Sequence, residues 1–433
     1  MTLMSHRIFR CHQLPRLNVR AVHGRYRVHR HAVWICWLLV TVGTIVGAAS
    51  PGHAWNPTVG ERLSGLIGEK DSVAVMDDRD QLLYAKHIDQ SRIPASTLKL
   101  LTSLVAIHTL GPEYRFRTDF YGGGDHALKV KGYGDPLLIS EVLSEIAGQL
   151  ADRLSEPVAD LILDDSYFQK PLIIPGVNDS LNPYDAPSGA LCANFNTVYY
   201  QRQNGVYVSA EPQTPLLPVV MDRIHRTGLD HGRIVLSHNK QELLLYAGQL
   251  LAYFLSEKDL PVQGDIRPGR VDPATDRLIL AHRSPFTLVQ VIEKMLEFSN
   301  NYVANQLLIA AGARAYGPPG TLDKGVRLLK DYLEQQMGMQ GAVFEEGSGI
   351  SRKNRLTARV MLLILDRFTP YRHLLQQDGP VWFKTGTLHG IRTRAGYIEG
   401  GGDDVYRFVV LLNSNRHSAA RIVSIIQKGL EEE

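Results

Sequence analysis

The chain has 433 residues, of which 44% are hydrophobic and 21% are charged. A polypeptide of this length and composition buries a substantial core, which excludes an intrinsically disordered chain and suggests two or three domains. The net charge of +3 derives from the first 31 residues, which hold seven arginines and no acid. Residues 55–433 carry 40 basic and 44 acidic side chains, so nothing in their charge suggests a nucleic-acid-binding surface.

The first 54 residues predict an export leader. The arginine-rich start precedes an uncharged apolar stretch, residues 32–49, which is the layout of a secretory signal. Gly52-His53-Ala54 places small residues at the two positions that a signal peptidase recognises, so residues 1–54 are interpreted as a signal peptide cleaved after Ala54. The alternative is an uncleaved N-terminal anchor, with membrane association through residues 32–49. Both interpretations place the folded part outside the cytoplasm.

Cysteine and histidine usage predicts no disulfide, metal or cofactor. Only Cys192 lies beyond the leader, so no intramolecular disulfide can form in the exported part. His225, Asp230 and His231 could suggest a metal, but their irregular spacing is more typical of a solvated turn. We therefore expect the function to depend on side chains alone.

Two strands and a long helix are predicted at the start of the folded part. Residues 72–77 and 81–88 are strand-like and flank a turn at 78–80, which indicates a hairpin. Residues 98–110 form a near-continuous apolar segment that is too long for a strand. This segment predicts a buried helix with Ser96 in its first turn.

The pattern then changes twice along the chain. Between residues 113 and 242, strand-like pieces alternate with Gly and Pro turns around one amphipathic helix at 141–154, which indicates an inserted mixed domain. Further helices are predicted at 243–255, 285–298, 302–313, 322–336 and 356–367. Strands follow at 381–388, 391–398 and 405–413, before a closing helix to residue 429. Because strands lie at both ends of the chain, we predict an α/β (α+β) domain of residues 55–112 and 243–433, with one antiparallel five-stranded sheet flanked by helices.

Three short motifs carry the candidate chemistry. Ser96-Thr97-Leu98-Lys99, Ser299-Asn300-Asn301 and Lys384-Thr385-Gly386 correspond to the S-x-x-K, S-D-N and K-T-G motifs of class A β-lactamases and penicillin-binding proteins. K-T-G occurs once in the chain and is the most specific of the three. S-x-x-K also occurs at 237–240, so the nucleophile has two candidates.

Burial distinguishes these two serines. A lysine three residues after a serine shares its helix face, but it accepts the serine proton only if desolvation and nearby positive charge depress the lysine pKa. Lys99 lies among leucines and a valine that exclude water, whereas Lys240 has polar neighbours that keep it solvated. Ser237 is interpreted as a helix N-cap, and Ser96 is predicted to be the nucleophile.

Beyond these motifs, residues 70–425 resemble the D-alanyl-D-alanine carboxypeptidase/endopeptidase family of class C low-molecular-mass penicillin-binding proteins. The separation of 203 residues between Ser96 and Ser299 also resembles this family, although residues 201–242 are short for the small domain that it nests inside its insertion. The other matching segments, in family order, are Gly134-Asp135-Pro136-Leu137, Asp164-Asp165-Ser166-Tyr167-Phe168, Pro175-Gly176, Ala186-Pro187, Asn194-Phe195-Asn196 and Gly347-Ser348-Gly349-Ile350-Ser351-Arg352.

The resemblance implies the penicillin-binding transpeptidase/β-lactamase-like fold and a serine-type D-Ala-D-Ala carboxypeptidase or endopeptidase of the bacterial periplasm. Its partners would be peptidoglycan stem peptides and, as covalent inhibitors, β-lactam antibiotics. Ser96 would attack the carbonyl of the penultimate D-alanine while Lys99 takes its proton. The backbone amides of Ser96 and Thr387 would form the oxyanion hole.

The resemblance also implies roles for the second and third motifs. Ser299 would relay a proton to the leaving D-alanine, and Asn301 would bind the substrate amide and orient Lys99. Lys384, with the hydroxyls of Thr385 and Thr387, would hold the terminal carboxylate.

Two further residues would shape substrate binding. Gly386 is expected to leave room for the substrate backbone against its strand. An acidic residue at the place of Asp179 reaches over the cleft in this family and pairs with the free amino group of diaminopimelate. The alternative for Asp179 is a solvated loop aspartate, which is common in Asn-Asp-Ser turns.

Two other function classes stay open: a β-lactam-hydrolysing enzyme and a catalytically silent peptidoglycan-binding scaffold. The hydrolase needs a base that deacylates the penicilloyl ester, and no glutamate can be assigned to that role. The scaffold is disfavoured because all three motifs keep their reactive residues. The choice between carboxypeptidase and endopeptidase and the oligomeric state are left open.

Overall fold

The computed structural model describes residues 57–124, 126–401, 404–414 and 416–431. The predicted leader, including the apolar segment 32–49, lies outside these residues. Within the described ranges, no helix combines the length and the apolar character that crossing a membrane requires. The same ranges contain no cluster of three or more His, Cys, Asp or Glu side chains arranged to hold a metal ion.

An antiparallel sheet joins the two ends of the described chain. Its strand order is β11-β12-β13-β14-β1-β2, and the first strand of the chain pairs with the last. The strands are β11 Gln376–Asp378, β12 Val381–Leu388, β13 Ile391–Glu399, β14 Val405–Leu412, β1 Asp71–Met76 and β2 Leu82–Lys86. The five predicted strands are confirmed, but the sheet has six. The additional strand β11 is short, polar and exposed, so it gave no hydrophobic pattern.

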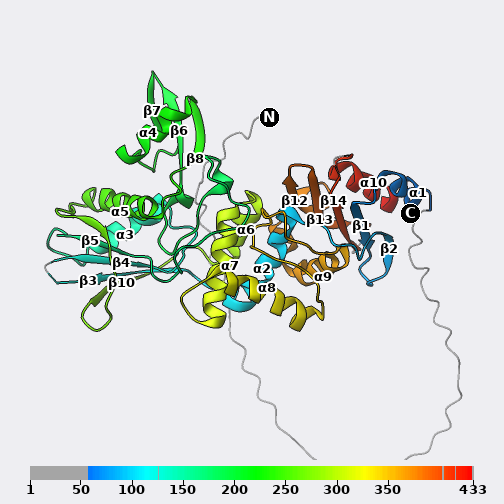
Figure 1. Cartoon of the computed structure of the whole chain (residues 1–433), viewed down its shortest axis with the longest axis horizontal. Coiled ribbons are helices and arrows are strands. Elements are labelled where there is room, and N and C mark those ends of the chain that lie inside the picture. Colours follow the sequence, from blue (N-terminus) through cyan, green and yellow to red (C-terminus); the bar gives the residue numbers. More distant parts are fainter. Residues whose placement is uncertain (1–56, 125, 402–403, 415, 432–433) are drawn as a thin grey trace, which may run out of the picture. The chain divides into compact units, whose positions relative to one another are not determined.

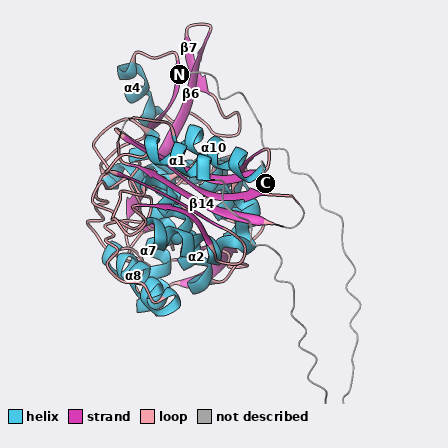
Figure 2. Cartoon of the chain, turned by 90° about the vertical axis from the view of Figure 1, so that its right-hand side faces the viewer, coloured by secondary structure: helices cyan, strands magenta, loops and turns pink. Residues whose placement is uncertain are grey.

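Residue alternation in these strands builds two layers. Val73 and Val75 face a cluster with Leu63 and Ile422, whereas Ala74 faces the opposite cluster. The first cluster lies under α1 (Pro57–Leu66) and α10 (Ala419–Glu431), and the second under α2 (Lys99–Leu110) and α9 (Ala358–Phe368). Figure 2 shows β14 between these helix layers. A sheet buried on both faces explains why its strands are rich in apolar residues.

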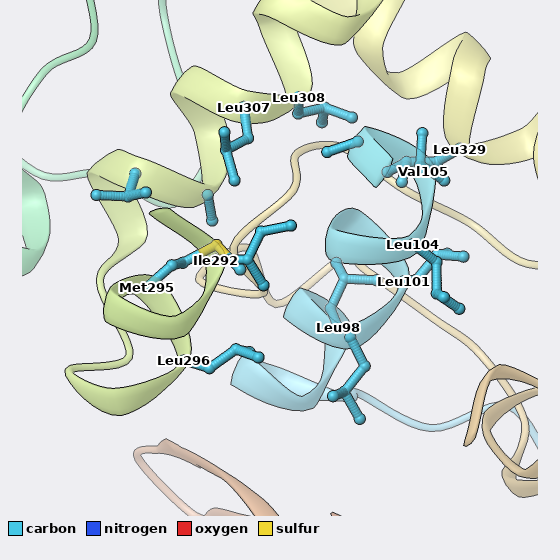
Figure 3. Packing of buried hydrophobic residues seen from close by; sticks show 14 of the residues in the cluster. Leu98, Leu101, Leu104, Val105, Ile292, Met295, Leu296, Leu307, Leu308 and Leu329 are labelled. Atoms are coloured by element: carbon cyan, nitrogen blue, oxygen red, sulfur yellow. The ribbon is translucent and has the colours of Figure 1, made fainter. Parts of the chain in front are cut away.

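The helical layer surrounds α2, which is buried on all sides over its first nine residues. Its neighbours are α6 (Leu288–Glu297), α7 (Asn301–Tyr316) and α8 (Leu322–Met337). Figure 3 shows side chains of their shared cluster, among them Leu101 and Leu104 of α2, Ile292 and Met295 of α6 and Leu307 of α7. These helices match the predicted ones, and they place the predicted nucleophile at the buried N-terminal end of α2.

A second sheet is built from the middle of the chain, and Figure 1 shows its strands beside α3 and α5. Its order is β10-β3-β4-β5-β9, with the strands β10 Arg277–Arg283, β3 Arg117–Gly122, β4 Leu128–Gly132, β5 Leu161–Asp164 and β9 Ile266–Pro268. The helices are α3 (Ser140–Ala151) and α5 (Lys240–Ser256). The boundaries of the inserted domain stay a prediction, but the strand pairings extend this sheet from residue 117 to residue 283, beyond the expected end at 242.

A third sheet is built from residues 197–235. These residues include most of the segment 201–242, which is short for the small nested domain of the family. The order of this sheet is β7-β6-β8, and it is accompanied by one helix. The elements are β6 Thr197–Gln203, β7 Val206–Ser209, α4 Pro218–Thr227 and β8 His231–Val235. Buried Tyr200, Val220 and Ile224 join it to the core of the second sheet.

Candidate active site

Ser96 lies in a 3-10 turn, η1 (Ala95–Leu98), that leads directly into α2. Ala95 has a φ of 48°, a left-handed conformation that is costly for a residue with a side chain. The turn is held at Pro94, whose carbonyl accepts hydrogen bonds from Thr97 Oγ1 at 2.7 Å and from Thr393 Oγ1 of β13 at 2.8 Å. The sheet and the helix start therefore position the serine jointly.

Lys99, the first residue of α2, is fully buried and faces three oxygen atoms. Its Nζ lies 2.9 Å from Ser96 Oγ, 2.7 Å from Asn301 Oδ1 and 2.7 Å from the carbonyl oxygen of Ser348. A neutral amine has two N–H groups and one lone pair. If the two N–H groups donate to the amide and carbonyl oxygens, the lone pair faces the Ser96 hydroxyl.

The charge state of Lys99 follows from its surroundings. Burial lowers the pKa of the ammonium group well below its usual value, and the positive charge of Lys384 lowers it further. The carboxylate of Glu346 opposes these two effects. The environment therefore favours the neutral amine that proton acceptance requires.

Ser299 and Asn301 lie at the junction of two helices. Helix α6 ends at Glu297, and the Asn300 side chain caps α7 by accepting a hydrogen bond from the amide of Val303. Ser299, between the helices, has a φ of 52°. The Asn301 amide is oriented by its second contact, because its Nδ2 donates to the carbonyl of Tyr184 at 3.2 Å and so turns Oδ1 to Lys99.

Lys384 approaches the same region from β12. Its Nζ donates to Ser299 Oγ at 2.8 Å and to the carbonyl of Thr385 at 2.9 Å. Burial lowers the pKa of Lys384 from its ordinary value to about 8. Because the residue is still mostly protonated at neutral pH, it supplies a positive charge beside Ser299.

Strand β12 has a free edge next to Lys384. Strand β11 pairs only with Val381, Trp382 and Phe383, so no strand covers residues 384–388 on that side among the described pairings. In an antiparallel pair, alternate residues turn their N–H and C=O groups away from the partner strand. The Thr385 carbonyl bonds Lys384, which indicates that Thr385, and with it Thr387, turns toward this free edge.

Gly386 is required by the packing of the chain itself. A Cβ at this position would lie 2.2 Å from Thr393 Oγ1 and 2.8 Å from the backbone nitrogen of Ser96. The expected reason was room for the substrate. That reason stays a prediction, and the structure adds a second one, because a side chain here would press on the amide of the nucleophile.

In the described part of the chain, no hydrogen bond or ion pair joins Asp179 to the three motifs. Its carboxylate is 89% exposed and lies 3.5 Å from His238 Nε2. The loop that carries it does reach the site, because Tyr184, five residues further on, accepts the hydrogen bond from Asn301. A role for Asp179 in substrate binding stays a prediction.

The second S-x-x-K segment forms no serine–lysine pair. Ser237 Oγ donates to Glu242 at 2.6 Å, while Lys240 Nζ donates to the carbonyl of Leu172 at 2.6 Å. The prediction that Ser237 caps the helix was wrong, because the Asn239 side chain accepts the hydrogen bonds from the first turn of α5. The expectation that Lys240 stays solvated was also too simple, since partial burial lowers its pKa.

Sequence reasoning missed the carbonyl acceptors of the site, Ser348 and Tyr184. Every residue type carries a backbone carbonyl, so the sequence does not show which carbonyls act as acceptors. The segment around Ser348 was noted only as a family match, and its two glycines are the available signal. Gly349 has a φ of 85°, and a Cβ there would lie 1.9 Å from the carbonyl oxygen of Ala95. This close approach brings the loop against the turn that carries Ser96.

Comparison with family models gives a match to the D-Ala-D-Ala carboxypeptidase 3 (S13) family over residues 65–222 and 229–377. The matched residues include Ser96, Lys99, Ser299 and Asn301 and end before Lys384.

Curated relatives and solved structures agree with this match. A D-alanyl-D-alanine carboxypeptidase of Actinomadura sp. (strain R39) is 25% identical over 430 residues, covering 82% of this chain and 79% of the relative. The D-alanyl-D-alanine carboxypeptidase DacB of Haemophilus influenzae is 23% identical over 405 residues, covering 76% of this chain and 84% of DacB. The crystal structure of penicillin binding protein 4 (dacB) from Haemophilus influenzae superposes with a TM-score of 0.68 at 20% identity, covering 86% of this chain and 98% of that one. The predicted fold is thereby confirmed.

Proposed function

The chain belongs to the D-Ala-D-Ala carboxypeptidase 3 (S13) family, and we propose that it cleaves the D-alanyl-D-alanine end of peptidoglycan stem peptides by acylating Ser96. One observation carries this proposal. The fully buried amine of Lys99 lies 2.9 Å from Ser96 Oγ, and two neutral oxygen acceptors occupy its other hydrogen-bonding directions. This arrangement suits a lysine that removes the serine proton.

The acylation step follows from these contacts. Lys99 accepts the proton of Ser96 as Oγ attacks the carbonyl carbon of the penultimate D-alanine, and negative charge develops on the carbonyl oxygen. The Ser96 amide, which lies beside Gly386, and the Thr387 amide at the free edge of β12 stabilise that charge. The C–N bond then breaks, and Ser299 relays to the nitrogen of the leaving D-alanine the proton that Lys99 took from Ser96. Lys99 is neutral again, and the acyl group stays on Ser96.

Substrate binding uses the free edge of β12. An extended peptide that lies along residues 384–388 adds a strand to the sheet and satisfies the outward backbone groups of this edge. Lys384 and the hydroxyls of Thr385 and Thr387 bind the terminal carboxylate, for which the buried ammonium provides charge. β-Lactam antibiotics carry a carboxylate next to a strained amide, so the same groups admit them as covalent inhibitors.

The site favours a peptidase over the alternatives. Rapid β-lactam hydrolysis needs a base at the acyl-enzyme. Among the described residues, the buried Glu346 accepts hydrogen bonds from six donors, and none of these donors belongs to Ser96. A silent scaffold has no use for a desolvated lysine in contact with a serine. We further propose that the protein acts in the periplasm, with its leader either cleaved or retained as an inner-membrane anchor.

Peptide hydrolysis tests the proposal. The protein is expected to release D-alanine from a pentapeptide ending in D-Ala-D-Ala and none from the matched peptide ending in D-Ala-L-Ala, and benzylpenicillin should block the release. Amino-acid analysis of the products provides the measurement. A D-alanyl-diaminopimelate cross-linked substrate, run in parallel, distinguishes endopeptidase from carboxypeptidase activity. Turnover of penicillin without release of D-alanine would instead indicate a β-lactam hydrolase, and neither reaction a scaffold.

We propose Asp179 as a residue for recognition of the diaminopimelate amine. Its exposed carboxylate lies on the loop that contacts Asn301 through Tyr184, so it is free to meet a charged side chain of the substrate. Asp179→Ala is expected to lower kcat/KM for peptides with a free diaminopimelate amine by about tenfold, as for the loss of a charge-assisted hydrogen bond.

Two controls make this prediction specific. Penicillin acylation should not change in Asp179→Ala, because penicillin lacks the amine. Asp230→Ala, at a second exposed aspartate of the inserted part, should retain wild-type kcat/KM. Equal losses for amine-bearing and amine-free peptides would make Asp179 a structural residue.

A further inference from the structure

Glu346 is a fully buried carboxylate that has no part in the reaction described above. One of its oxygen atoms accepts hydrogen bonds from the backbone amides of Gly349 and Ser351 and from the Asn354 side chain. The other accepts from the amide and hydroxyl of Ser348 and from the Asn305 side chain. All six distances lie between 2.6 and 3.2 Å, and none of the donors is a cation. Desolvation of a carboxylate is costly, and here six hydrogen bonds from neutral donors offset that cost.

The peptide group between Ser348 and Gly349 joins this carboxylate to Lys99. Its N–H, on Gly349, donates to Glu346 at 2.8 Å, and its C=O, on Ser348, accepts from Lys99 Nζ at 2.7 Å. A hydrogen bond at one end of a peptide group polarises the bond at the other end. Glu346 and Lys99 are therefore linked through one intervening peptide group.

Both helices that supply the catalytic groups also hold the loop of Glu346. Asn305 lies one turn after Asn301 on α7, and besides contacting Glu346 it accepts a hydrogen bond from the amide of Gly347 at 2.9 Å. Thr102, three residues after Lys99 on α2, donates to the carbonyl of Gly347 at 2.6 Å. The loop is thus held by both helices, and the Glu346 carboxylate accepts the hydrogen bonds that keep the loop in shape.

We propose that Glu346 is a positioning residue for Lys99, acting through the Ser348–Gly349 peptide group and through its negative charge. This inference rests on the proposed function, in which Lys99 is the base for Ser96. Glu346 fixes the carbonyl that directs the amine of Lys99, and its charge prevents burial from making that amine too weak a base.

The electrostatic surroundings of Lys99 support this assignment. The groups in contact with its amine are neutral: the Ser96 hydroxyl, the Asn301 amide and the Ser348 carbonyl. Two charges act on it from further away: Lys384 on β12, which lowers its pKa, and Glu346, which raises it. Removing the Glu346 charge should therefore lower the pKa of Lys99 and shift the acidic limb of the acylation profile to lower pH.

The test is the pH dependence of the second-order rate constant for acylation by benzylpenicillin, which reports groups of the free enzyme. Glu346→Gln removes the negative charge. It also replaces one carboxylate oxygen by an amide NH2 group, so the three donors that this oxygen served lose their acceptor. We expect a rate at least tenfold lower at the optimum and an acidic limb displaced by roughly one pH unit to lower pH. Glu346→Asp keeps the charge and should keep the limb near its wild-type position while lowering the rate.

A matched control lies next in the sequence. Glu345 belongs to the same loop but pairs with Lys353 and with the Ser351 hydroxyl, so Glu345→Gln should leave the limb in place. If Glu346→Gln does not fold, Ser348→Ala provides a second test. It removes one neutral donor from the carboxylate, which strengthens the effect of the charge on Lys99 and moves the limb to higher pH.

Two results overturn the inference. The first is a folded Glu346→Gln protein whose acidic limb stays at the wild-type pH, whatever its rate constant for acylation. The second applies if that variant does not fold: an unchanged limb in Ser348→Ala. A wild-type protein that forms no penicillin adduct overturns the proposed function itself and this inference with it, whereas an active wild type with an unmoved limb overturns only the role of Glu346.

Discussion

Replacing Lys99 with alanine is expected to lower the rate constant for acylation by benzylpenicillin by about a thousandfold, within the range for loss of a general base. The reason is that Lys99 Nζ lies 2.9 Å from Ser96 Oγ. Apart from this amine, no group that accepts protons near neutral pH is hydrogen-bonded to Ser96 Oγ among the described residues. Rapid-quench acylation kinetics measure the rate constant separately from binding.

The control for this variant is Lys240→Ala. Lys240 has the same sequence relation to Ser237, but it donates to the carbonyl of Leu172 and forms no pair with that serine. Its replacement should leave acylation unchanged. If Lys99→Ala acylated at the wild-type rate and lost only affinity, Lys99 would be a binding residue and the base would have to be another group.

Lys384→Ala is expected to fail in a different way. Lys384 bonds Ser299 and lies at the edge where the carboxylate of the substrate binds, so its loss should weaken binding as well as slow acylation. In the wild type, the charged form of Lys384 predominates below its pKa of about 8. Activity should therefore fall as the pH rises through about 8, and this alkaline limb should be absent in Lys384→Ala.

Much of the fold could be predicted because its strands and helices carry strong periodic patterns. The predicted strand 381–388 coincides with β12, and the helix predicted at 98–110 begins one residue before α2. Strand β11 could not be found, since three exposed polar residues have no hydrophobic pattern. The extent of the second sheet could not be predicted for another reason: β10 is far from β3 in the sequence, and only their pairing shows that they belong together.

In the site too, some residues could be predicted from the sequence and others could not. Ser96, Lys99, Ser299, Asn301 and Lys384 could be named because reactive side chains in short motifs leave a signature. The structure brings Lys99 into contact with Ser96 and Asn301, and Lys384 into contact with Ser299. The backbone carbonyls of Ser348 and Tyr184 leave no such signature, because any residue type supplies them. Glu346 was missed because an isolated glutamate reveals its burial only in three dimensions. The cap of α5 was placed two residues early because Ser237 and Asn239 are both good capping residues.

The acyl-enzyme at Ser96 is the central claim, and replacing Ser96 should have the largest effect of all. Among the described residues that Lys99 Nζ contacts, only Ser96 offers an oxygen that can become a nucleophile, since the other two contacts are amide and carbonyl oxygens. Ser96→Ala removes this oxygen. Adduct formation with penicillin should be lost completely, while the fold should persist because a hydroxyl is exchanged for a hydrogen atom in a turn held by Thr97 and Thr393.

Intact-mass spectrometry after incubation with benzylpenicillin tests this claim most directly. The wild type and Ser237→Ala should each gain the mass of one penicilloyl group, and Ser96→Ala should gain none. An adduct that survives in Ser96→Ala, or a wild type that forms no adduct at all, would contradict acylation at Ser96.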